Sequence, residues 1–124
     1  MDKIRLQKTM TLEFDEKAID AIKSLQRPGS PDILGRIVTI YLEKTPALLA
    51  EIQAGVAAND ADAVKMAAHS LKSSSAYLGA TGLADQCNQL ESKASIDDLS
   101  DVAAHVDAIN NGFEAAAEQL KKIA

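Results

Sequence analysis

Apolar side chains recur every three or four residues along most of this chain, a spacing that places them on one face of an α-helix. The pattern occupies residues 15–25, 31–58, 61–78, 81–93 and 98–121. Only short turns separate the later segments, and helices joined by such short connections fold back antiparallel on one another. Aromatic residues, which favour strands, make up only 3% of the chain. The sequence therefore predicts an all-α fold: an antiparallel up-down four-helix bundle with a short additional N-terminal helix.

Polar residues in front of the segments predict where the helices begin. The expected caps are Asp15, Ser30, Asp60 and Thr81 for the first four helices, and either Asp98 or Ser100 for the last one. Gly79 can adopt the left-handed backbone that ends a helix. Pro46 interrupts the second segment, but the apolar stripe resumes beyond it in nearly the same register. We therefore expect one long, bent helix there rather than two.

The length and charge of the chain limit its organisation and its partners. With 124 residues, it is long enough for one domain with a core. We interpret residues 1–13 as an N-terminal tail or linker and residues 14–124 as the helical bundle domain. The net charge of −5 argues against nucleic-acid binding. No apolar run approaches the roughly 20 residues of a membrane-spanning helix, and no secretory signal is visible. We expect a cytoplasmic domain with no membrane insertion.

Residues suited to metal or nucleotide binding form no motif in this sequence. His69, His105 and the single Cys87 are far apart, without the spacing of a metal site. No glycine-rich phosphate-binding loop is present, so we expect no ATP binding, no metal and no cofactor of the chain's own. Cys87 lies on an inner stripe and is interpreted as a buried apolar residue. His105 lies at the edge of an apolar stripe and is interpreted as structural.

The segment at residues 61–78 carries the candidate reactive group. Its inner side is apolar or small, and His69 points in roughly the opposite direction. Residues three or four positions apart share a helix face. The neighbours of His69 on its face are therefore Lys65, Met66, Lys72, Ser73 and, one turn further along, Ala76. An imidazole beside a cation on the outside of a packed helix is a candidate reactive site.

The sequence from His69 to Gly79 resembles the active helix of histidine-containing phosphotransfer (HPt) domains. In that family the pattern is His-x-(apolar)-Lys-Gly/Ser-(small)-(small), with a glycine near the helix end. The matching residues here are His69, Leu71, Lys72, Ser73, Ser74, Ser75 and Gly79. The resemblance covers most of the chain, from about residue 14 to about residue 123. It implies a histidine phosphotransfer module of a two-component phosphorelay, which is not an enzyme that uses ATP.

The resemblance also implies roles for three side chains. His69 is the expected phosphoacceptor, which takes a phosphoryl group from an Asp of one response-regulator receiver domain and passes it to an Asp of another. Lys72 is expected to neutralise phosphoryl charge as a mobile point charge. Glu91 stands where some family members have Gln, and its carboxylate would accept the Nδ1 proton of His69. For Glu91, a solvated residue at the helix edge is the alternative interpretation.

The expected partners follow from the same resemblance. They are response-regulator receiver domains, with a hybrid sensor histidine kinase as a further candidate. The docking surface is expected around the histidine, at Lys65, Met66, Ser70, Ser73, Ala76 and Tyr77. Mg²⁺ is expected on the receiver rather than on this chain. A shuttle that must expose its histidine is expected to be a monomer.

Two other functions are compatible with the same residues. One is a non-phosphorylated helical adaptor, which would use the same face only to dock a signalling partner. Docking alone, however, does not require a histidine at position 69. The other is a small hydrolase with His69 as general base, which would need a pocket beside the histidine.

Overall fold

The computed structural model describes residues 14–123. Its helices are α2 (Glu16–Lys23), α3 (Ile33–Ala57), α4 (Ala61–Tyr77), α5 (Thr81–Ser95) and α6 (Ala103–Ile123). No strand occurs between residues 14 and 123, so the predicted all-α class is confirmed. Residues 1–13, interpreted above as a tail or linker, lie outside the described residues, as does residue 124.

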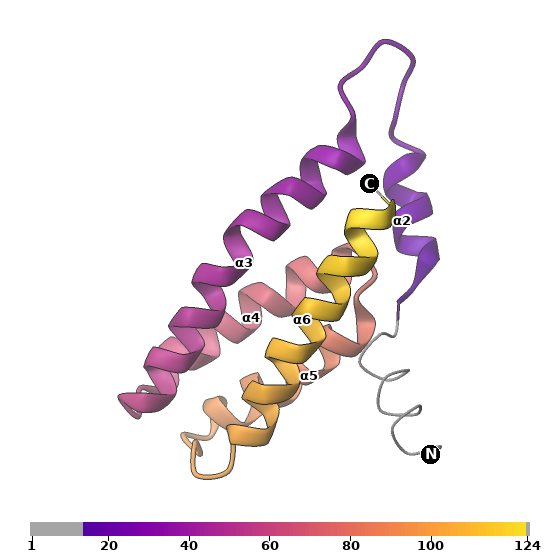
Figure 1. The fold of residues 1–124 in the computed structure, drawn as a ribbon. Coiled ribbons are helices and arrows are strands. Elements are labelled where there is room, and N and C mark those ends of the chain that lie inside the picture. The colour runs from indigo at the N-terminus through magenta and orange to yellow at the C-terminus, as the bar shows by residue number, and fades with distance from the viewer. Residues whose placement is uncertain (1–13, 124) are drawn as a thin grey trace.

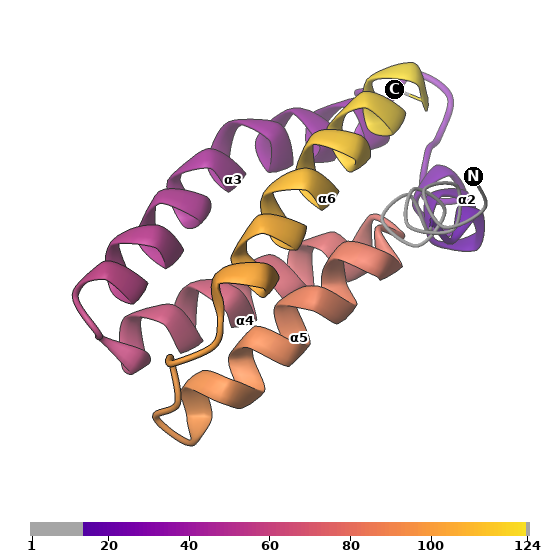
Figure 2. The same cartoon turned by 60° about the horizontal axis from the view of Figure 1, so that its bottom comes forward.

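The four long helices form a closed ring. Each packs against the next one along the chain, and α6 also packs against α3. Figures 1 and 2 show α3, α4, α5 and α6 running alternately up and down. The short helix α2 packs against α3 at the end of the bundle that holds the α4–α5 turn (Figure 2). The predicted up-down bundle with an additional N-terminal helix is confirmed.

Of the caps predicted for the first four helices, two are present and two are wrong, and the cap predicted for the last helix is also wrong. Asp15 and Asp60 cap α2 and α4, accepting hydrogen bonds from Lys17 N–H and Ala63 N–H. The cap of α3, however, is Asp32, whose carboxylate accepts from Gly35 N–H at 3.0 Å. A carboxylate satisfies the free N–H groups of a first turn and also favours its positive end. Ser30 is instead part of the preceding turn, where its N–H bonds Arg27 O.

The prediction that Thr81 caps α5 is wrong because the connection before it is too tight. Ala80 N–H donates to Ser75 O at 2.8 Å and closes the end of α4. Ala80 is also the N-cap of α5, so Thr81 is already helical. The last helix begins later than expected. Asp98 and Ser100 bond each other in a separate turn, and α6 starts only at Ala103.

The helix that contains Pro46 is continuous, as predicted (Figure 2). The glycine at the end of α4 is also in the predicted backbone conformation, with φ of +84° at Gly79. A Cβ atom at Gly79 would collide with the carbonyl oxygen of Asp15, and Asp15 N–H donates to Gly79 O at 2.7 Å. Gly79 therefore allows the start of α2 to lie directly against the α4–α5 turn.

The core is apolar apart from a few polar groups. Its largest fully buried side chains are Ile22, Ile52, Leu71, Leu78, Leu83, Leu90, Ile109 and Leu120. Ser75 is also fully buried, and its hydroxyl shares a 2.8 Å hydrogen bond with the Tyr41 hydroxyl. The Tyr41 ring meets Phe113 edge to face, with centroids 5.8 Å apart. This bond and ring contact join α3, α4 and α6 beneath the face that carries the candidate site.

Candidate functional site

Helix α4 positions His69 by burying its opposite side. The buried residues of α4 are Val64, Ala67, Ala68, Leu71 and Ser75, all on the face that the sequence predicts. Small side chains there let the neighbouring helices approach closely. The side chain of His69 is 60% exposed, because it leaves the helix on the side away from this packed face.

Glu91, on α5, lies directly beside the histidine. Its Oε2 atom is 2.9 Å from Nδ1 of His69, and its side chain is only 16% exposed. Helices α4 and α5 share the most extensive contact in the bundle, which holds the two side chains at this separation. The structure thus brings together two residues that are 22 positions apart in the sequence.

Lys72 shares the same carboxylate. Its Nζ atom lies 2.6 Å from Glu91 Oε1 and 3.4 Å from Asn88 Oδ1. Glu91 Oε1 is buried, and the Lys72 ammonium is its partner in an ion pair. One carboxylate therefore holds the histidine with one oxygen and the lysine with the other.

Asn88 is a neighbour that the sequence analysis did not identify. It precedes Glu91 by one helical turn on α5, so the two side chains share a face. This spacing was the available signal. It identifies Asn88 only after Glu91 has been placed beside the histidine, because nothing in the sequence around Asn88 itself is distinctive.

The charges fix the protonation of the site. The Lys72 ammonium above all, and then the hydrogen bond from His69, lower the pKa of Glu91 below its ordinary value of 4.5, against the opposing effect of burial. The carboxylate is therefore ionised near neutral pH and can only accept hydrogen bonds. Nδ1 of His69 must then be the donor, and in the neutral ring the free lone pair is on Nε2. Within residues 14–123, no hydrogen bond engages Nε2.

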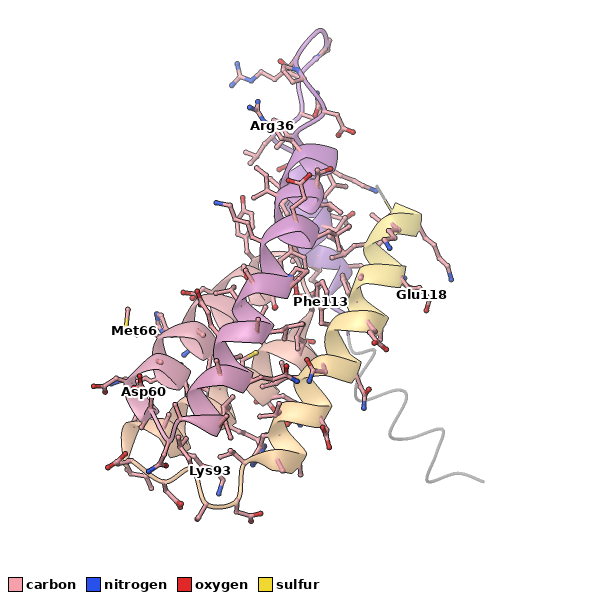
Figure 3. All side chains as sticks on the ribbon, turned by 60° about the vertical axis from the view of Figure 1, so that its left-hand side comes forward. Arg36, Asp60, Met66, Lys93, Phe113 and Glu118 are labelled. Atoms are coloured by element: carbon pink, nitrogen blue, oxygen red, sulfur yellow. The ribbon has the colours of Figure 1, made fainter. Side chains whose placement is uncertain are left out.

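The other residues expected around the histidine are all on the surface. Lys65, Met66, Ser70, Ser73, Ala76 and Tyr77 are exposed. Two of them are large and apolar or aromatic: Met66 is 71% and Tyr77 is 54% exposed. Figure 3 shows Met66 projecting outward from the bundle. Met66 and Tyr77 thus expose apolar or aromatic surface on the helix that carries His69.

An open hollow lies between α3 and α4. Its volume is about 380 Å³, and its lining residues are Leu48, Glu51, Ala63, Met66, Ala67 and Ser70. His69 is not among them. The hollow therefore does not provide the enclosed pocket beside the imidazole that a hydrolase would use.

The remaining candidates of the sequence make no hydrogen bond or ion pair with His69 in the described part of the chain. Cys87 is fully buried, and burial raises the pKa of its thiol to about 12, so it is an unreactive apolar residue. His105 is half-buried, with Nδ1 3.4 Å from Gln86 Oε1. Between residues 14 and 123, no three His, Cys, Asp or Glu side chains gather into a group that could bind a metal ion. None of the helices in that range has the length and apolar character needed to cross a membrane.

Known proteins match the chain in family and in fold. The family model of the Hpt domain matches residues 36–122, a span that contains His69, Lys72 and Glu91. No curated protein sequence matches the chain significantly. The chain is similar in structure to histidine-containing phosphotransfer protein B (HptB) from Pseudomonas aeruginosa PAO1, with a TM-score of 0.79 and 23% sequence identity. The match covers 89% of this chain and 92% of the other.

Proposed function

The chain belongs to the Hpt domain family, and on that premise we propose that His69 is the residue that carries the phosphoryl group. An Hpt domain performs histidine phosphotransfer in a phosphorelay, as an intermediate rather than as a catalytic enzyme. The observation that carries the proposal is the hydrogen bond between His69 Nδ1 and the ionised Glu91. It leaves the lone pair of an exposed ring on Nε2, the atom that then attacks phosphorus.

Lys72 supplies positive charge for the phosphoryl group. Its ammonium is 29% exposed and is held near the imidazole by Glu91 and Asn88. A second anion at Nε2 competes with the carboxylate for the same cation. Lys72 then moves from Glu91 toward the phosphoryl oxygens, which a flexible side chain can do by rotation alone.

The partners proposed for this chain are receiver domains, with which Hpt domains relay phosphate. The receiver supplies the Asp that holds the phosphoryl group and, with it, the Mg²⁺ ion. Lys65, Met66, Ser70, Ser73, Ala76 and Tyr77 form the docking surface, since they are exposed and share α4 with the histidine. A hybrid sensor histidine kinase is a further partner, and the shuttle acts as a monomer in the cytoplasm.

A transfer assay tests the proposal. The chain is incubated with receiver domains phosphorylated on Asp, in the presence of Mg²⁺, and acid-labile, base-stable phosphate is measured on it. The wild-type protein should become labelled, and His69→Gln should abolish the label. His105→Gln is the matched control, because it removes the other histidine of the chain and should leave labelling unchanged.

Two outcomes would count against His69. Label that survives His69→Gln would place the phosphoryl group on another residue. Absence of label with every receiver tried would favour the adaptor, in which the face around His69 only docks a partner.

A further inference from the structure

The partner of His69 Nδ1 is a carboxylate, and this choice has a chemical consequence beyond orienting the ring. An amide oxygen at the same place would accept the same hydrogen bond but would carry no charge. The Glu91 carboxylate has a full negative charge, is 16% exposed and lies 2.9 Å from the ring nitrogen. It can therefore stabilise a positive charge on the imidazole as well as fix its tautomer.

We propose that Glu91 keeps the Nδ1 proton on the ring after His69 has been phosphorylated, so that the phosphoryl group arrives and leaves without any proton transfer. This inference rests on the proposed role of His69. In it, Glu91 is a positioning residue, because it touches the ring at Nδ1 and not the phosphorus atom.

The two half-reactions balance without a proton donor or acceptor. In the first, the Nε2 lone pair forms a bond to phosphorus and the P–O bond to the donor Asp breaks, with its electron pair leaving on the carboxylate oxygen. The ring retains its Nδ1–H and becomes a cation that carries the phosphoryl dianion. In the second, a carboxylate oxygen of the acceptor Asp bonds to phosphorus and the P–N bond breaks. Its electron pair returns to Nε2, and the ring is neutral again with Nδ1–H in place.

The half-reaction that depends on Glu91 is the second one, because the P–N bond breaks more readily when the phosphorylated ring is a cation. Neutral imidazole leaves when the P–N bond of the cationic ring breaks, whereas an imidazolate anion would have to leave from a deprotonated ring. An opposite charge within about 4–6 Å favours the charged form of a titratable group. Once Lys72 turns toward the phosphoryl oxygens, the whole charge of the carboxylate acts on the ring.

The charged groups around Glu91 are few. From α4 it faces His69 and Lys72. On its own helix, the nearby thiol of Cys87 is neutral, with its pKa raised to about 12 by burial. From α6, which packs against the other side of α5, His105 bonds Gln86 instead. The ionisation of a phosphorylated ring is thus set by Glu91, by Lys72 and by the phosphoryl group itself, with the exposed Lys65 one turn earlier on α4 as a further charge.

The titration of the phosphorylated ring tests the inference directly. The full chain is phosphorylated with potassium phosphoramidate, and the ¹⁵N shifts of the His69 ring are followed against pH in the wild type, Glu91→Gln and Glu91→Asp. The ring cation of the wild type should lose its proton at least about one pH unit higher than that of Glu91→Gln. Glu91→Asp, which keeps the charge on a shorter side chain, should restore part of the difference.

Asp85→Asn is the matched control, since Asp85 is an exposed carboxylate on the same helix that contacts Gln89 and not His69. Its titration should coincide with that of the wild type. A second readout is the rate of transfer from phosphorylated His69 to a receiver. As pH is raised, this rate should begin to fall at a lower pH in Glu91→Gln than in the wild type, because the ring of the variant loses its proton earlier.

Wild-type and Glu91→Gln titrations within about half a pH unit of each other would overturn the inference. An equal shift in Asp85→Asn would also overturn it, because the cause would then be net charge and not the contact. Neither outcome bears on the proposed function, which is contradicted only if His69 takes up no phosphoryl group in the wild type.

Discussion

At the scale of single residues, the two carboxylate oxygens of Glu91 contact two different basic side chains. The contact with His69 fixes the tautomer, and the contact with Lys72 keeps a positive charge within reach of the ring. Each contact supports the other, because the ammonium keeps the carboxylate ionised and an ionised carboxylate can only accept from Nδ1.

Lys72→Ala should lower the rate of phosphoryl transfer to His69 by roughly tenfold, which corresponds to about 1.4 kcal/mol in the barrier. The variant removes the positive charge that offsets the incoming phosphoryl group. It should also raise the pKa of Glu91, because Lys72 is the main cause of its lowering. The transfer rate is measured by rapid-quench labelling and the carboxyl titration by NMR. Lys44→Ala, which removes an exposed lysine from α3, should change neither quantity, and an equal loss there would show that only net charge matters.

The sequence predicts part of this site and not the rest. The place of His69 and Lys72 on one face follows from helical spacing alone, since they are three residues apart on the same helix. The position of Glu91 depends on how α5 rotates against α4. Its contact with His69 could therefore be reached only through the family resemblance, with a solvated edge residue as the alternative. The ion pair with Lys72 and the neighbour Asn88 depend on side-chain packing across the two helices, which no local pattern encodes.

At the scale of helices, the periodicity of apolar residues predicts the number and order of the elements, while their ends follow from competition between neighbouring polar groups. Ser30 and Asp32 are both good caps by type, and the tight turn that uses Ser30 N–H leaves Asp32 as the cap. At the α4–α5 connection, Gly79 and Ala80 complete the whole turn, so Thr81 has no room outside the helix. Such competition is resolved by backbone geometry, which the sequence alone leaves open.

Gly79→Ala should destabilise the bundle more than Gly29→Ala. Both glycines have positive φ, +84° at Gly79 and +80° at Gly29, so both variants carry the left-handed backbone cost of about 1–2 kcal/mol. A Cβ at Gly79 also meets the backbone of Asp15, whereas nothing lies within 4 Å of a Cβ at Gly29. Urea unfolding of the two variants measures the contact with the start of α2, at Asp15 and Ala18, as the difference between their free energies of unfolding. Equal losses would mean that α2 moves away at little cost.

At the scale of the whole molecule, the lowered pKa of Glu91 links the stability of the bundle to pH. The pKa of the carboxyl is lower in the folded chain than its ordinary value of 4.5. The folded state therefore binds the proton less readily than the unfolded state does. The resulting stabilisation is fully present above pH 4.5 and is lost as pH falls through the folded pKa.

Glu91→Gln should make the bundle less stable than the wild type at pH 7, by up to about 1 kcal/mol. The difference should shrink as pH falls below 4.5, because protonation of Glu91 then removes the same interactions from the wild type. Urea unfolding at a series of pH values measures this convergence. The pKa of Asp98 is also lowered, by its hydrogen bonds with Ser100, but Asp98 is common to both proteins and cancels. A difference that stays constant down to pH 3 would contradict the linkage.

The site is divided between two helices, so it is complete only when α4 and α5 are both folded and packed together. A chain fragment with α4 alone would present His69 and Lys72 but not the carboxylate on α5 that selects the tautomer. With His69 in its proposed role, a copy in which α4 and α5 are not packed together should be a poor recipient of phosphate, because its imidazole lacks the Glu91 contact.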